Sequence, residues 1–240
     1  MAISDEIREQ RKKLSGMTSK QKISYIIYYY KFHFLGALFV LTILISLIHS
    51  IVTKKEISLY CAMINSLPYD SELTALREDF SEYAGIDLNE NDVVIDCTMN
   101  INYESQDQMT YGYVQKLMAL LNTGDIDVFV ADKPVVDNYG QIAAFKNLEE
   151  FLPDDLKQEL EGQFDIYEYT FTDEDTGETA TLPIGLYIYN SKILRECYES
   201  NGMQGMYTEE MNPIFCITAN GKNPENAIKF LRYLISENET

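Results

Sequence analysis

Residues 32–52 read FHFLGALFVLTILISLIHSIV, a run of 21 residues without Asp, Glu, Lys or Arg. An α-helix of this length, at a rise of 1.5 Å per residue, crosses a hydrocarbon core about 30 Å thick. Tyrosines and phenylalanines gather at residues 25–34, as in the aromatic belt at a membrane surface. The run therefore predicts a transmembrane helix at residues 32–52, which organises the rest of the chain.

The charges on the two sides of this run have opposite sign. Residues 1–31 hold seven basic and three acidic residues, whereas residues 53–240 hold twelve basic and thirty-five acidic ones, a net charge of −23. Basic flanks stay in the cytoplasm by the positive-inside rule. The sequence thus predicts a single-pass protein of the cell membrane, with a cytoplasmic tail at 1–31 and an extracytoplasmic domain at 56–240.

Three alternatives to a permanent anchor fit the apolar run less well. A cleaved signal peptide has a shorter apolar region and an A-x-A-like exit, and the sequence SIVTK at 50–54 offers none. A lipoprotein needs a cysteine in a small-residue box just past the run, but Cys61 follows Leu59 and Tyr60 in a strand-like stretch. A buried core helix is rarely apolar all round over this length.

The composition of the outer domain excludes several kinds of function. Its negative charge disfavours nucleic acid, because binding to phosphates needs a basic face. Both histidines, His33 and His49, lie in the apolar run, so the domain has none. This excludes a Ser-His-Asp triad, a Cys-His pair and a zinc site with histidine ligands. We expect no metal, no cofactor and no catalytic residue.

The cysteines and one acidic turn show no metal-binding spacing. Cys61, Cys97, Cys197 and Cys216 match no zinc pattern, and a disulfide remains open because three pairings of four cysteines are possible. The acidic stretch DEDTGE at 173–178 resembles a calcium loop, but it lacks the spacing of the glycine and the bidentate glutamate. We interpret it as the turn of a β-hairpin.

Apolar runs and helical spacings alternate through the first half of the domain. Strands are expected at 57–64, 92–101 and 126–131, because near-continuous apolar runs are typical of strands buried on both faces. Helices are expected at 69–83, 106–121 and 133–145, followed by a loop and helix at 148–161. This alternation predicts a parallel sheet with right-handed crossovers.

The second half of the domain changes character. Residues 164–171 and 178–182 predict a β-hairpin, 184–189 and 214–219 predict strands, and 192–199 and 224–235 predict helices. The expected fold class is therefore α/β. It comprises one N-terminal transmembrane helix and a single three-layer α/β lobe, with a mainly parallel sheet and a β-hairpin insertion.

Four segments, in the same order, resemble extracellular solute-binding proteins of the type II periplasmic-binding-protein fold. GDIDVFVA at 124–131 is similar to a "GD.PDV" strand, and NLEEFLP at 147–153 to the segment that follows it. LPIGLYIYNSKIL at 182–194 is similar to their crossover strand, and NPENAIKFLRYLI at 223–235 to their last helix. The resemblance spans roughly residues 57–237 and implies a ligand-binding lobe.

The chain departs from this family in one large respect. The family has a second lobe of well over a hundred residues between the crossover strand and the last helix, where this chain has only residues 195–222. The resemblance thus implies a truncated, single-lobe version that cannot close on a ligand. The anchor, with its tyrosine-rich flank, is similar to those of single-pass membrane proteins of Gram-positive bacteria.

Polar residues that follow the predicted strands are the candidate ligand-binding residues, because ligands of open α/β sheets bind beyond the carboxyl ends of the strands. Turn and cap chemistry favours the same residue types there. The candidates are Asn65, Ser66, Asn100, Asn102, Asp132 and Tyr187.

We expect a non-catalytic binding or assembly module with a protein or peptide partner at the cell surface. Two alternatives stay open. One is a solute-binding accessory of an ABC transporter, whose small ligand the sequence does not identify. The other is a carboxylate-based hydrolase, for which Asp132 is the one acid at a strand end.

Overall fold

The computed structural model of the chain describes residues 8–9, 12, 16–52, 54–66, 70–104, 108–172, 177, 179–199 and 212–236. Its contacts divide the chain into two units, Met1–Lys54 and Lys55–Thr240.

The first unit is built on one long helix, α2 (Ser19–Val52). It starts well before the apolar run, where the backbone N–H and the hydroxyl of Thr18 both donate to Gln21 Oε1, at 3.0 and 3.1 Å. Within α2, the segment Tyr30–His49 is the one helix of the described residues that is long and apolar enough to cross a membrane. Its side chains are exposed along its whole length; Leu38, for example, is 61% exposed.

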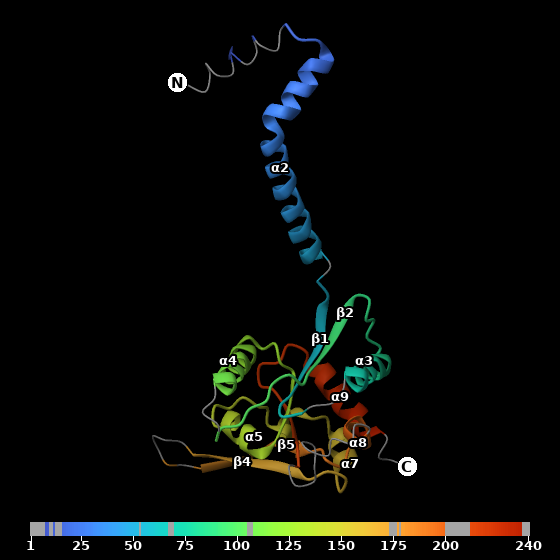
Figure 1. The fold of residues 1–240 in the computed structure, drawn as a ribbon. Coiled ribbons are helices and arrows are strands. Elements are labelled where there is room, and N and C mark those ends of the chain that lie inside the picture. Colours follow the sequence, from blue (N-terminus) through green and yellow to red (C-terminus); the bar gives the residue numbers. More distant parts are fainter. Residues whose placement is uncertain are drawn as a thin grey trace. The chain divides into compact units, whose positions relative to one another are not determined.

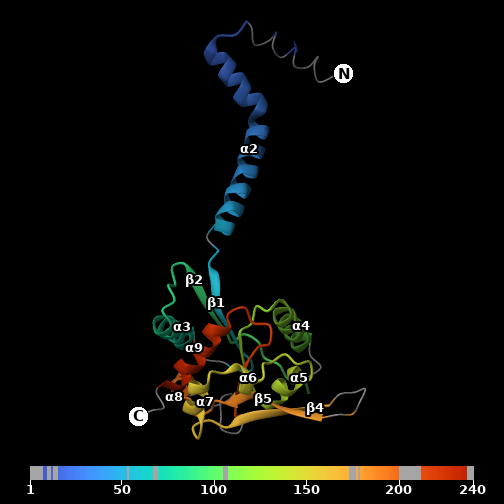
Figure 2. The same cartoon turned by 180° about the vertical axis from the view of Figure 1, so that it is seen from behind.

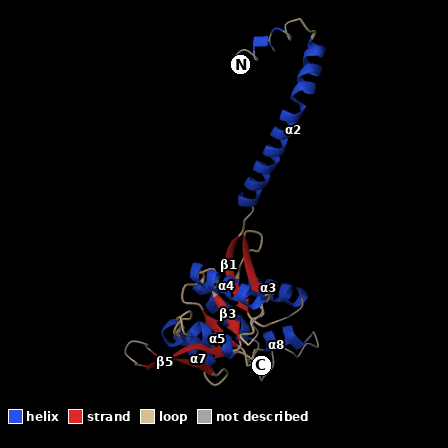
Figure 3. Cartoon of the chain, turned by 60° about the vertical axis from the view of Figure 1, so that its left-hand side comes forward, coloured by secondary structure: helices blue, strands red, loops and turns tan. Residues whose placement is uncertain are grey.

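The second unit contains a six-stranded mixed sheet with the order β2-β1-β3-β6-β5-β4. Figure 3 shows its strands in red, with helices beside them in blue. The parallel and antiparallel pairings make β1, β2, β3 and β5 run in one direction and β6 and β4 in the other. The α/β class and the mainly parallel sheet expected from the sequence are therefore confirmed. The strands are β1 (Glu56–Met63), β2 (Asn91–Asp96), β3 (Val128–Ala131), β4 (Ile166–Thr172), β5 (Thr179–Tyr187) and β6 (Ile214–Ile217).

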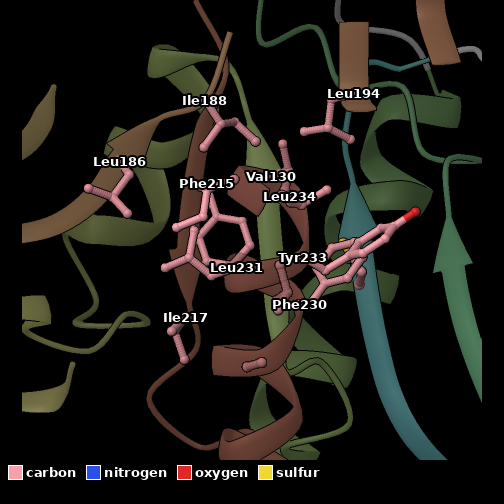
Figure 4. Close-up of a cluster of buried hydrophobic side chains, with 14 of the residues drawn as sticks. Val130, Leu186, Ile188, Leu194, Phe215, Ile217, Phe230, Leu231, Tyr233 and Leu234 are labelled. Atoms are coloured by element: carbon pink, nitrogen blue, oxygen red, sulfur yellow. The ribbon is translucent and has the colours of Figure 1, made fainter. Parts of the chain in front are cut away.

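One face of the sheet is covered by α3 (Asp70–Ala84), α6 (Leu148–Phe151), α7 (Asp154–Leu160), α8 (Lys192–Glu199) and α9 (Pro224–Ile235). Their apolar side chains pack on alternate residues of the strands. In Figure 4, Phe230, Leu231 and Leu234 of α9 lie against Val130 and Phe215 of the sheet. Phe80 of α3 packs beside them, and its ring is edge-on to that of Phe230, with 4.9 Å between the ring centroids. We call this the α9 face.

The opposite face is covered by α4 (Gln108–Thr123) and α5 (Lys133–Gly140). Leu117 and Leu121 of α4, and Val136 and Tyr139 of α5, pack on Phe129 and on the other alternate positions of the strands. Figures 1 and 2 show α4 and α5 on one side of the sheet and α3, α8 and α9 on the other. We call the side that α4 and α5 cover the α5 face. Together the sheet and its two helical layers form the expected three-layer lobe.

The structure differs from the sequence prediction in the second half of the domain. The predicted hairpin arm at 178–182 and the predicted strand at 184–189 are one continuous strand, β5. Pro183 lies within this strand and is accommodated because the register with β4 shifts between Tyr167 and Glu168. Most of the acidic turn, residues 173–176 and 178, lies outside the described residues.

Candidate functional site

Two neighbouring parallel strands send their following segments to opposite faces of the sheet. After β1 the chain passes to α3 on the α9 face, whereas after β3 it passes to α5 on the α5 face. Since β1 and β3 are hydrogen-bonded neighbours, their carboxyl ends form a topological switch point. Loops that diverge from such a point leave a crevice between them, the usual position of ligands in open α/β sheets.

A hollow of about 300 Å³ lies at this switch point. Residues from the carboxyl ends of all three neighbouring strands line it: one follows β1, a continuous loop segment follows β2, and three residues follow β3. We call it the switch-point hollow. Its lining residues are Asn65, Asn100, Ile101, Asn102, Tyr103, Glu104, Asp132, Pro134 and Val135.

Asn65 joins the ends of β1 and β2. Its Nδ2 donates to the carbonyl oxygen of Ile101 at 3.0 Å, and its Oδ1 accepts from the N–H of Ile101 at 2.7 Å. Its own N–H donates to the carbonyl of Met99. The backbone of Asn65 has a φ of 59°, in the left-handed region that Asn tolerates better than most residues. Asn65 therefore fixes the floor of the hollow.

Asp132 stands at the start of α5, directly after β3. Its carbonyl accepts the N–H of Val136 in the first turn, but its side chain makes no capping hydrogen bond. Burial raises the pKa of the Asp132 carboxyl, and the hydrogen bond from Asn65 Nδ2 at 3.4 Å, together with the backbone N–H groups of Asp132 and Val135, only partly counteracts this. Asp132 is thus a half-buried carboxylate on the wall of the hollow.

The loop after β2 forms the remaining wall. It begins with a turn in which Asp96 Oδ1 accepts the N–H of Thr98 at 2.9 Å, so β2 ends at Asp96 and not at the predicted residue 101. Farther along, Asn102 Oδ1 accepts the N–H of Glu104 at 2.9 Å. The Tyr103 hydroxyl accepts from Asn138 Nδ2 of α5 at 3.0 Å, which ties the loop to α5.

The structure brings four of the six predicted residues to one hollow: Asn65, Asn100, Asn102 and Asp132. Ser66 is buried beneath it, and its hydroxyl donates to the carbonyl of Met63. Tyr187 ends β5 at the same edge of the sheet, but β6 lies between β3 and β5 and separates it from the hollow.

Sequence reasoning missed Tyr103 and Glu104, which also line the hollow. The prediction carried β2 on to residue 101, so the loop that follows it was expected to start too late. The Asp-x-Thr spacing of Asp96 and Thr98, typical of a turn in which an Asp side chain caps the backbone, was the signal for an earlier end.

The described residues hold no group of three His, Cys, Asp or Glu side chains placed to bind a metal. Cys61, Cys97 and Cys216 are all buried, and the Cys197 side chain lies outside the described part. Burial raises the pKa of Cys61 and of Cys216 well above the ordinary value, so both thiols stay protonated. The polar functional groups that line the hollow are carboxylates, amides and one phenol.

Comparisons with known proteins give a weak structural similarity. No family model and no curated protein matches the chain. A solved structure of the periplasmic binding protein AttC of Agrobacterium tumefaciens strain C58, in an open unliganded conformation, is similar at 11% identity with a TM-score of 0.36. The match covers 75% of this chain and 79% of that one.

Proposed function

We propose that α2 anchors the chain in a membrane and that the second unit is a non-catalytic binding module on the extracytoplasmic side. The observation that carries the proposal is the switch-point hollow, where groups from three strand ends converge. Its size is at the lower end of the range for small-molecule sites, about 300–1,000 Å³. The anchor rests on the exposed apolar segment Tyr30–His49, and the orientation rests on the charges at its two sides.

The lining of the hollow supports binding over catalysis. The described lining residues include no Ser, Thr, Cys, His or Lys, so catalysis there would have to rest on the carboxylates of Asp132 and Glu104 and the phenol of Tyr103. Several of their polar groups are already engaged with the backbone, as Asn65 is with Ile101 and Asn102 with Glu104. A rigid rim of this kind suits the recognition of a protruding group on a protein or peptide partner.

The openness of such a site limits affinity for free solutes, because a bound solute keeps much of its surface in water. Calorimetry of the full chain in nanodiscs, against sugars, amino acids, amines and short peptides, tests this. We expect saturable binding of one class, with dissociation constants for free small molecules above about 1 μM. Asn100→Ala should weaken that binding, and Asn89→Ala, on a distant turn, should not.

Two outcomes contradict the proposal. Submicromolar one-to-one binding of a free small molecule by the monomer contradicts an open binding face. Chemical conversion of the bound compound, detected by mass spectrometry, contradicts a non-catalytic role and favours the carboxylate-based hydrolase.

A further inference from the structure

The switch-point hollow is lined by hydrogen-bond acceptors and negative charge. Asp132 and Glu104 supply two carboxylates, and the exposed amides of Asn100 and Asn102 supply carbonyl oxygens. None of the described residues that line it is basic. An anionic group placed there would meet repulsion, whereas a cationic one would find partners on two walls.

Lys133 is the nearest lysine to Asp132 in the sequence, but its charge is engaged with another carboxylate. Its Nζ donates to Asp137 Oδ2 at 2.6 Å and to the Tyr167 hydroxyl at 3.1 Å, and it lies over the Tyr167 ring at 5.2 Å from the centroid. These hydrogen bonds raise the pKa of Lys133, so its charge stays committed to Asp137. Asp132 has no ion pair with any described basic side chain.

A cation bound nearby would stabilise the ionised form of the Asp132 carboxyl group. Its half-buried position disfavours the charged form, and its contact with Asn65 Nδ2 is long at 3.4 Å. A cation bound next to Asp132 would compensate for the lost hydration and favour the ionised carboxylate. The hollow thus has, on its wall, a carboxylate that hydrogen bonds stabilise but that no described basic side chain neutralises.

Tyr103 adds an aromatic surface beside the acids. Its side chain is 41% exposed, and its hydroxyl is fixed by Asn138 of α5. An exposed tyrosine ring can bind a cation over its face, an interaction worth about 0.5–1 kcal/mol at exposed sites. The hollow therefore joins a charged contact, carbonyl acceptors and a π-face.

We propose that the switch-point hollow binds a primary ammonium group. The three N–H donors of an ammonium match the carboxylate oxygens of Asp132 and Glu104 and the amide carbonyl of a neighbouring Asn. The group comes either from a small free amine or from a lysine side chain of a peptide. This inference rests on the proposed binding function and names the chemistry of its ligand.

The test uses the full chain in nanodiscs of zwitterionic phosphatidylcholine, so that no lipid charge competes for the probe. The probes are n-butylamine, an acetylated and amidated pentapeptide with one central lysine, and the same peptide with norleucine or arginine at that position. Because the chain has no tryptophan, Tyr103→Trp places a single indole at the rim as a fluorescent reporter.

We expect the lysine peptide to bind saturably and to change the indole emission, and the norleucine peptide to do neither. Asp132→Asn should weaken binding about tenfold, as expected for a charge-assisted hydrogen bond. Glu104→Gln, at an exposed position, should weaken it less and keeps the test valid if Asp132→Asn fails to fold. Glu78→Gln, an exposed acid on α3 that removes the same charge, is the matched control.

The two sources of the ammonium separate in the same experiment. Equal affinity for butylamine and the lysine peptide assigns recognition to the ammonium group alone, and tighter binding of the peptide assigns it to a lysine side chain. The proposal is overturned if the norleucine or arginine peptide binds as well as the lysine peptide, or if Glu78→Gln weakens binding as much as Asp132→Asn. If a sugar or a carboxylate compound binds at the reporter instead, the binding function stands and this inference fails. If nothing binds, both fail.

Discussion

At the scale of single residues, Asn65 combines two tasks. Its side chain satisfies both backbone polar groups of Ile101, and its own backbone occupies the left-handed region. An unsatisfied buried backbone group costs about 1–3 kcal/mol, and a left-handed conformation costs a non-Gly residue about 1–2 kcal/mol. The loop that walls the hollow therefore depends on this position.

Replacing Asn65 separates the two tasks. Asn65→Gly loses the side-chain bonds but keeps the backbone conformation, and it should destabilise the second unit by roughly 2 kcal/mol. Asn65→Ala also loses the conformational tolerance and should cost about 1 kcal/mol more. Urea unfolding followed by near-ultraviolet circular dichroism measures both, with Asn89→Ala as control. Equal stability of both variants and the wild type would show that the Asn65 bonds do not hold the loop.

Asp96 makes the stability of the second unit depend on pH. Burial works against its charged form, but hydrogen bonds from Lys116, Thr98 and Tyr60 outweigh burial and lower the pKa of Asp96 to about 2. The stabilisation is complete above the unfolded pKa of about 3.9 and is lost as the pH falls towards about 2.

Asp96→Asn removes this pH dependence. Between pH 5 and pH 2 the wild type should lose up to about 2 kcal/mol more of its unfolding free energy than the variant does. Unfolding curves at several pH values measure the difference, and Asp79→Asn, an exposed acid on α3, is the control. Parallel pH profiles for the wild type and Asp96→Asn would show that another group is responsible.

At the scale of elements, the strands and helices differ in how far the sequence predicted them. The apolar runs at 57–64 and 126–131 identified β1 and β3, because strands buried on both faces need apolar residues throughout. The helical spacing identified α3, α4 and α9 in the same way. The position of β6 between β3 and β5 left no local trace, since strand pairing joins residues far apart in the chain.

The residues of the candidate site also differ in how far the sequence predicted them. Polar residues directly after a strand were predicted, because the chain direction alone puts them at the carboxyl edge. Tyr103 and Glu104 were missed since their position depends on where β2 ends, and Tyr187 was included since the pairing of β5 with β6 was unknown. Local pattern thus located the edge, and long-range pairing decided which residues share the hollow.

Two glycines that follow helices show how an element boundary depends on its surroundings. Gly85 after α3 and Gly124 after α4 both have positive φ, of 72° and 67°. A Cβ on Gly85 would meet open space, whereas a Cβ on Gly124 would collide with the carbonyl oxygen of Asn220.

The matched substitutions should therefore differ in cost. Gly85→Ala should destabilise the second unit by about 1 kcal/mol, the conformational cost alone. Gly124→Ala should cost roughly 3 kcal/mol or more, because the backbone next to β3 must also move. Thermal unfolding of the two variants compares them directly. Similar melting temperatures would mean that the turn at Asn220 adapts without loss.

At the scale of the whole molecule, the proposed topology places the acidic unit outside the cytoplasm. The basis is the excess of basic residues before the segment Tyr30–His49 and of acidic residues after it. Protease added to intact protoplasts should degrade residues 55–240 and spare an epitope tag at the N-terminus. A protected C-terminal unit with a cleaved N-terminal tag would contradict the topology, and lysed protoplasts serve as the control.

The central position of β6 in the sheet also determines when the second unit can complete its fold during synthesis. Residues 214–217 leave the ribosome last among the strands, yet they fill the gap between β3 and β5. Until they arrive, both neighbours present unpaired edges, and the sheet cannot close. On the topology proposed above, the second unit would therefore stay open during synthesis, in the state that passage through a translocation channel requires. The sheet would be completed only once residues 214–217 had crossed, and until then the second unit would depend on protection from aggregation.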